Sequence, residues 1–194
     1  MIDRNISNEF QENGVVLLKQ VIDLEWIDEL KKGIECNFAN PSKYKCVYEE
    51  INGKEIFYDD YCNWQRIKEY KNFIFNSNIA KIAGLLMQSK KVNLFHEHVL
   101  IKEIGSKKRT PWHQDQGYYC VQGKDNVSIW IPLDKIDINS SMEFILGSHK
   151  WNKTFLPTKF KGHDYIHKDE EFEKIPDIES NRDSYQIISY NCDV

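Results

Sequence analysis

A change of hydrophobic period near Lys91 constrains the fold of this 194-residue chain more than any other feature. Before it, apolar residues recur every three or four positions, as on one face of an amphipathic helix. The clearest such stretch is DLEWIDELKKGIECNF, where Asp23 is placed to cap the helix N-terminus. NWQRIKEYKNFIF and SNIAKIAGLLMQS predict two more helices. SNEFQEN predicts a short first helix, followed by a turn at Gly14 and a strand over residues 15–18.

From Lys91 onward apolar and polar residues alternate, which is the period of a β-strand. The predicted strands are KVNLFHEHVLIKEIG, PWHQDQGYYC, VSIWIPLD, SMEFILGSH and YQIISYNCDV. A helix-rich part over residues 1–90 and strands over residues 91–194 predict a single domain of the α+β or mainly β class. In such a domain the helices pack on a barrel or jelly roll. Residues 150–182 predict a long polar loop.

The stretch WHQDQGYY places a histidine and an aspartate two positions apart, His113 and Asp115. On a strand, two such side chains point to the same face and can bind one metal ion. An imidazole nitrogen and a carboxylate oxygen suit Fe(II). With a second histidine from another strand they would form a 2-His-1-carboxylate triad, which leaves coordination positions open for a 2-oxo acid and dioxygen.

The blocks HEHVLIKEIG, WHQDQGYY, VSIWIPLDKI and SMEFILGSHK resemble, in order and spacing, those of the phytanoyl-CoA dioxygenase family, and FQENGVVLLKQVID resembles its opening. The resemblance covers most of the chain. It implies a double-stranded β-helix, which is a jelly roll, with N-terminal helices packed on it. It also implies Fe(II)- and 2-oxoglutarate-dependent hydroxylation of a small organic or acyl substrate by dioxygen.

Residue by residue, the resemblance implies that His113 and Asp115 are catalytic and hold the iron. Lys102 and Trp130 fall where the family lines its 2-oxoglutarate pocket. An ammonium group buried beside a co-substrate carboxylate is reasonable, because an isolated buried lysine would be costly. Related halogenases lack the carboxylate ligand, so the presence of Asp115 implies hydroxylation.

The family's second iron histidine and its 2-oxoglutarate arginine follow a Gly-Asp turn, and this sequence reaches CDV at that place. We therefore expect both residues, and the last strands, to lie past residue 194. This expectation predicts weak or absent activity, and unpaired strand edges through which the chain forms a homodimer. His149, in a Gly-Ser-His turn, and His163 and His167, in the polar loop, are weaker candidates for a replacement ligand.

Two alternatives remain open at this point. In the first, HEHVLIKE, with Glu103 five residues after His98, resembles part of a cupin metal motif, and metal binds at His96 and His98 and not at Asp115. In the second, the chain is a non-catalytic truncated homologue that acts as a binding or oligomerising domain.

Composition excludes several other classes of protein. The chain has 26 basic and 30 acidic residues and a net charge of −4, which argues against a general nucleic-acid binder. No apolar run approaches the roughly 20 residues of a membrane span. The five cysteines show no Cys-x-x-Cys spacing and the N-terminus has no apolar signal core, which predicts reduced thiols and a cytoplasmic protein.

Overall fold

The computed structural model describes residues 4–158 and 172–193. The chain divides into two compact units, and each unit contains segments from both the N-terminal and the C-terminal half of the sequence. The first unit comprises Met1–Lys19, Ala83–Lys90 and Thr110–Val194, and the second comprises Gln20–Ile82 and Lys91–Arg109.

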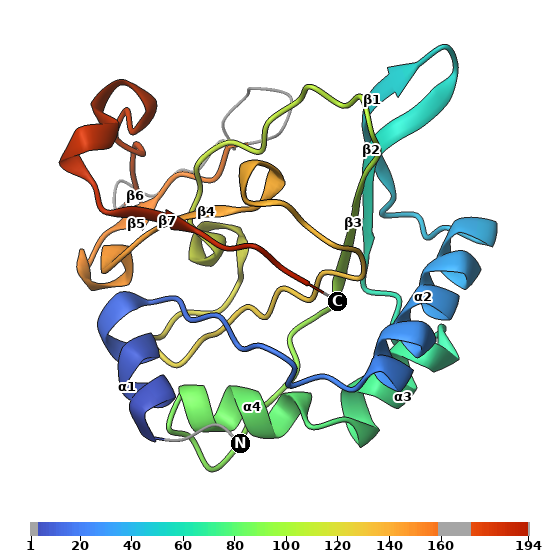
Figure 1. The fold of residues 1–194 in the computed structure, drawn as a ribbon, viewed down its shortest axis with the longest axis horizontal. Coiled ribbons are helices and arrows are strands. Elements are labelled where there is room, and N and C mark those ends of the chain that lie inside the picture. The colour runs from blue at the N-terminus through green and yellow to red at the C-terminus, as the bar shows by residue number, and fades with distance from the viewer. Residues whose placement is uncertain (1–3, 159–171, 194) are drawn as a thin grey trace. The chain divides into compact units, whose positions relative to one another are not determined.

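Three of the four predicted helices coincide closely with helices of the structure, and the remaining one, in NWQRIKEYKNFIF, begins later than predicted (Figure 1). They are α1 (Arg4–Asn13), α2 (Leu24–Ala39), α3 (Lys68–Asn76) and α4 (Ile79–Leu86). Asp23 occupies the N-cap position of α2 with extended backbone angles, but its side chain accepts no capping hydrogen bond. Gly14 makes the predicted turn after α1, with φ at +75°. Among the described helices, each is too short or too polar to cross a lipid bilayer.

The second unit contains a three-stranded antiparallel sheet in the order β1 (Cys46–Ile51), β2 (Lys54–Tyr61) and β3 (His98–Lys102). Asn52 and Gly53 both have positive φ and form the tight turn between β1 and β2, as a two-residue hairpin requires. The prediction that helices precede strands is therefore wrong, because this hairpin lies between α2 and α3.

Helix α2 packs on α3 through an unusually close approach at Gly33. Trp26 meets Phe73 edge to face, with 5.8 Å between ring centroids. A Cβ atom at Gly33 would lie 2.7 Å from Cδ1 of Tyr70, a ring that is only 3% exposed. Glycine is thus needed here for the contact between helices, not for its backbone freedom.

We expect Gly33→Ala to destabilise the fold by about 1–3 kcal/mol, because the new methyl group overpacks a buried ring. Helix propensity alone predicts the opposite sign, since alanine favours a helix by about 1 kcal/mol over glycine. Urea unfolding followed by circular dichroism measures the difference. A stabilised Gly33→Ala chain would show that α2 and α3 are packed less closely than described.

In the first unit, the described residues form two short two-stranded sheets. β4 (Glu143–Ile145) pairs antiparallel with β7 (Ile187–Ser189), and β5 (Thr154–Phe155) pairs parallel with β6 (Phe172–Glu173). Helix α1 is tied to the turn after β4, where the Gly147 amide donates to the Asn13 carbonyl at 2.8 Å. Four short 3₁₀ helices complete the described elements: η1 (Asp115–Tyr118), η2 (Ile138–Ser140), η3 (Ser148–Lys150) and η4 (Glu179–Ser184).

The described residues thus form a mixed α+β structure with mainly antiparallel pairing, in which several predicted strands are shorter than expected or do not form. Residues 15–18, 111–114 and 127–134 belong to no strand. Alternation shows only that a segment can be a strand, whereas a ladder needs a partner whose position the alternation does not encode.

Candidate metal centre

His113 and Asp115 come together in the structure, although not in the predicted way. They do not lie on a strand, because residues 111–114 are irregular and Asp115 begins the 3₁₀ helix η1. The turn of the chain into η1 brings His113 Nε2 within 3.3 Å of Asp115 Oδ1. The predicted pair is therefore adjacent, and a turn rather than a strand pleat makes it so.

The imidazole of His113 is oriented by the backbone that precedes it. Its Nδ1–H donates to the Pro111 carbonyl at 2.8 Å. Because that bond uses Nδ1 as the donor, Nε2 is the nitrogen that faces Asp115. The ring also meets Tyr118 edge to face at 5.8 Å between centroids. Such support fixes the ring and leaves one nitrogen for a proton or a metal ion.

The carboxylate of Asp115 is held through its other oxygen. Ser128 Oγ donates to Oδ2, and the Tyr119 hydroxyl lies 3.5 Å from the same atom. Oδ1 is therefore the oxygen directed at His113. Ser128 was not predicted as a site residue, and nothing in VSIWIPLD distinguishes its hydroxyl from any other.

The pair fits two adjacent positions of a metal coordination sphere. Two ligand atoms about 2.1 Å from a metal and at right angles to each other lie about 3 Å apart, close to the 3.3 Å between Nε2 and Oδ1. Both side chains are partly accessible, His113 at 35% and Asp115 at 46%. An ion can therefore reach the pair without unfolding the chain.

Strand β5 supports the segment that carries the pair. Gln114, between the two residues, donates from Nε2 to the Lys153 carbonyl and accepts from the Phe155 amide, both at 3.1 Å. A Cβ atom at Gly117 would lie 2.5 Å from the Phe155 carbonyl oxygen, so only glycine allows η1 to approach β5. The position of the pair thus depends on β5.

The two residues predicted to bind 2-oxoglutarate lie in different units. Lys102, on β3 of the second unit, donates from Nζ to the Lys108 carbonyl and lies over the Phe57 ring at 5.3 Å. Burial lowers the pKa of Lys102 below its usual value. Trp130 belongs to the first unit and is 43% exposed.

The other histidines have varied surroundings. His98 donates from Nε2 to Asp59 at 2.8 Å, and its ring centroid lies 6.5 Å from that of His96. His149 bonds from Nε2 to the Gln11 carbonyl at 3.0 Å. His163 and His167 lie outside the described residues. Within residues 4–158 and 172–193, no three side chains of His, Cys, Asp or Glu are grouped so as to hold a metal ion.

The contact between His113 and Asp115 shifts both of their pKa values. The hydrogen bond to Asp115 is the main reason why the pKa of His113 is raised. Burial lowers this pKa, and the hydrogen bond to the Pro111 carbonyl raises it further. The bond between His113 and Asp115 lowers the pKa of Asp115, again against burial. The stabilising effect of the histidine proton is complete below the unfolded pKa and is lost as pH rises through the raised folded value. The stabilising effect of the ionised Asp115 carboxylate is present above its unfolded pKa and is lost as pH falls through the lowered folded pKa.

We expect Asp115→Asn to move the pKa of His113 down toward about 6.5, its value in model peptides. Titration of the imidazole Cε1–Hε1 signal by NMR, assigned with His113→Gln, measures the change. Asp125→Asn is the control, because Asp125 is an exposed carboxylate in the same part of the chain. An unchanged His113 pKa in Asp115→Asn would contradict the described contact.

The fold and the site together define a mixed α+β protein with a His-x-Asp pair of suitable geometry for one divalent metal. The sequence profile of the phytanoyl-CoA dioxygenase (PhyH) family matches residues 10–193, so the chain belongs to that family, as its sequence blocks predict. The family has a jelly-roll-type fold and its chemistry is generally that of Fe(II)- and 2-oxoglutarate-dependent oxygenases. No curated protein matches the chain.

Proposed function

We propose that this chain is an Fe(II)- and 2-oxoglutarate-dependent dioxygenase that hydroxylates a small organic or acyl substrate. Family membership supports the oxygenase chemistry. The proposal assigns the iron to particular residues because His113 Nε2 lies 3.3 Å from Asp115 Oδ1. A hydrogen bond to the Pro111 carbonyl orients the imidazole, and a hydrogen bond from Ser128 orients the carboxylate.

In this proposal His113 and Asp115 hold the iron, which when bound supplies the activation of dioxygen at the expense of 2-oxoglutarate. The Pro111 carbonyl keeps Nδ1 protonated, so that Nε2 is available as a ligand. Ser128 keeps Oδ2 occupied, so that Oδ1 is the ligand oxygen. A carboxylate at position 115 occupies the place that a halide takes in related halogenases, and the proposed product is therefore an alcohol.

The proposal also includes the finer features that the family implies. We propose that the fold is of the family's jelly-roll type, and that Lys102 binds a carboxylate of 2-oxoglutarate. The partly desolvated ammonium of Lys102 would gain an ion pair with a co-substrate carboxylate. All five cysteines are unpaired, which supports a reducing compartment such as the cytoplasm.

The test is succinate formation from 2-oxoglutarate by the purified chain, with and without Fe(II), under air and under nitrogen. We expect succinate that requires both Fe(II) and dioxygen, and more of it than the weak or absent activity that the sequence alone predicts, because the described pair is already adjacent and oriented. Succinate formation that is equal in the presence and absence of iron, or no succinate under any condition, would contradict the proposal.

A further inference from the structure

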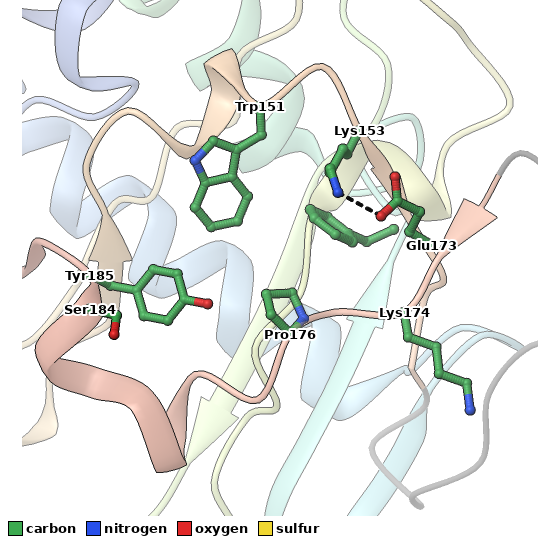
Figure 2. Close-up of a pocket in the computed structure, with 8 residues that line it drawn as sticks. Trp151, Lys153, Glu173, Lys174, Pro176, Ser184 and Tyr185 are labelled. Carbon is green, nitrogen blue, oxygen red and sulfur yellow. Dashed lines mark hydrogen bonds and ion pairs between the residues drawn. The ribbon is translucent and has the colours of Figure 1, made fainter.

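The first unit contains a cavity of about 410 Å³, within the range of small-molecule sites. One part of its wall is aromatic. Trp151 lies 6.0 Å from both Phe155 and Tyr185, measured between ring centroids. Figure 2 shows the Trp151 ring, the Tyr185 hydroxyl and the Pro176 ring directed toward a common space. Such a wall favours a flat, apolar ligand, because aromatic rings gain from stacked or edge-to-face contact.

The opposite part of the wall is an ion pair. Lys153 Nζ lies 2.7 Å from Glu173 Oε2, and the two side chains are 47% and 54% exposed (Figure 2). An anionic ligand group at this pair would be attracted by Lys153 but repelled by Glu173, and a cationic group would meet the reverse. Lys174 also lines the cavity, but Figure 2 shows its side chain directed away from the pair. A neutral group that both donates and accepts, such as a hydroxyl or an amide, can bond to both without breaking the pair.

The cavity and the His113–Asp115 pair are supported by the same segment, residues 153–155, which includes β5. Lys153 and Phe155, which line the cavity, are the two residues whose backbone bonds to the Gln114 side chain. Gln114 lies between the two proposed iron ligands in sequence. A ligand in the cavity therefore contacts the strand that positions the proposed metal site.

From these contacts we infer that the cavity binds the substrate, and that the substrate is a small, planar aromatic molecule with a neutral hydroxyl or amide group. Its ring packs against Trp151 and Tyr185, and its polar group lies at the Lys153–Glu173 pair. The assignment of the ligand as substrate rests on the proposed function, whereas the binding itself does not.

Binding is tested with three probes of one shape and different charge: 2-naphthol, 2-naphthoate and 2-naphthylmethylammonium. Isothermal titration calorimetry at pH 7 on the metal-free chain measures each affinity. We expect the wild-type chain to bind 2-naphthol about tenfold or more tightly than either charged probe. Glu173→Gln should reverse the preference toward 2-naphthoate, and Lys153→Gln toward the ammonium probe, because each leaves one charge without its partner.

Trp151→Ala should weaken 2-naphthol binding about tenfold or more through the lost ring contact. Circular dichroism checks that this variant is folded, and the two conservative glutamine variants test the same pocket without removing a ring. Lys135→Gln is the matched control, because Lys135 forms an exposed ion pair with Asp193 elsewhere. Equal affinities for the three probes, no binding of any probe, or unchanged preference in both glutamine variants would overturn the inference.

Asp115→Asn separates this inference from the proposed function. It should keep wild-type affinity for 2-naphthol while losing metal. If no probe binds but succinate formation still depends on iron, the inference about the cavity is overturned and the proposed function is not. If 2-naphthol binds as expected but no iron-dependent succinate forms, the binding site is supported and the proposed function is overturned.

Discussion

Asp115→Ala is expected to reduce Fe(II)-dependent succinate formation by at least about 100-fold, to the iron-free background. Loss of residues that merely orient metal ligands typically costs 10- to 100-fold in metal affinity or activity, and Asp115 is proposed as a ligand itself. The side chain also accepts from His113, Ser128 and Tyr119. Its removal therefore deletes one ligand and removes one of the contacts that orient the imidazole providing the other.

The matched control is Asp125→Ala, which removes an exposed carboxylate ten positions further along the chain. It should form succinate at the wild-type rate, which excludes a general effect of lost negative charge. Ser128→Ala should fall between the two, because the carboxylate remains but one oxygen loses its donor. Wild-type activity in Asp115→Ala would show that the iron is held elsewhere.

Asp60→Ala is expected to destabilise the fold by about 2–4 kcal/mol, because each donor left without an acceptor in a buried site costs about 1–3 kcal/mol. Asp60 lies on β2 and is 4% exposed. It accepts from Asn37 Nδ2 at 2.8 Å, from the Ser42 amide at 2.7 Å and from the Ser42 hydroxyl. The carboxylate thereby links the end of α2 and the following loop to the sheet, and alanine would leave these buried donors without an acceptor.

Burial alone would raise the pKa of Asp60, but the donors from Ser42, Asn63 and Asn37 hold it below its ordinary value. Its contribution is therefore present above the unfolded pKa and lost as pH falls through the folded one. Urea unfolding at pH 7 and at lower pH measures both effects in wild type and Asp60→Ala. Asp28→Ala, on the exposed face of α2, is the control and should change stability by no more than about 0.5 kcal/mol. An Asp60→Ala chain of wild-type stability would contradict the described network.

The helices were predictable because their signals are local. The period of 3.6 residues in the first half identifies α1, α2, α3 and α4, and the cap at Asp23 gives the start of α2. The β1–β2 hairpin was missed even though Asn52-Gly53 between alternating segments is a strong hairpin signal. Its two strands lie between α2 and α3, whereas the prediction assigned residues 1–90 to a helix-rich part and strands only to residues 91–194.

The His113–Asp115 pair was predictable as a pair, but its geometry was not. Spacing two apart indicated one strand face, whereas the structure places the residues at the entry to a 3₁₀ helix. Ser128, Gln114 and Gly117 act through contacts 13 to 41 residues away in sequence. Such non-local partners have no periodic signature in one sequence, so only the folded chain identifies them.

The most direct test of the central claim is a titration of the metal-free chain with Co(II) as a stable substitute for Fe(II), followed by calorimetry and the visible spectrum. We expect one site whose affinity for Co(II) falls by about 100-fold or more in both His113→Ala and Asp115→Ala and is unchanged in Asp125→Ala. We also expect weaker Co(II) binding as pH falls below the raised pKa of His113, because the metal and the proton compete for Nε2. Wild-type affinity for Co(II) in either His113→Ala or Asp115→Ala would contradict the claim that these two residues hold the metal.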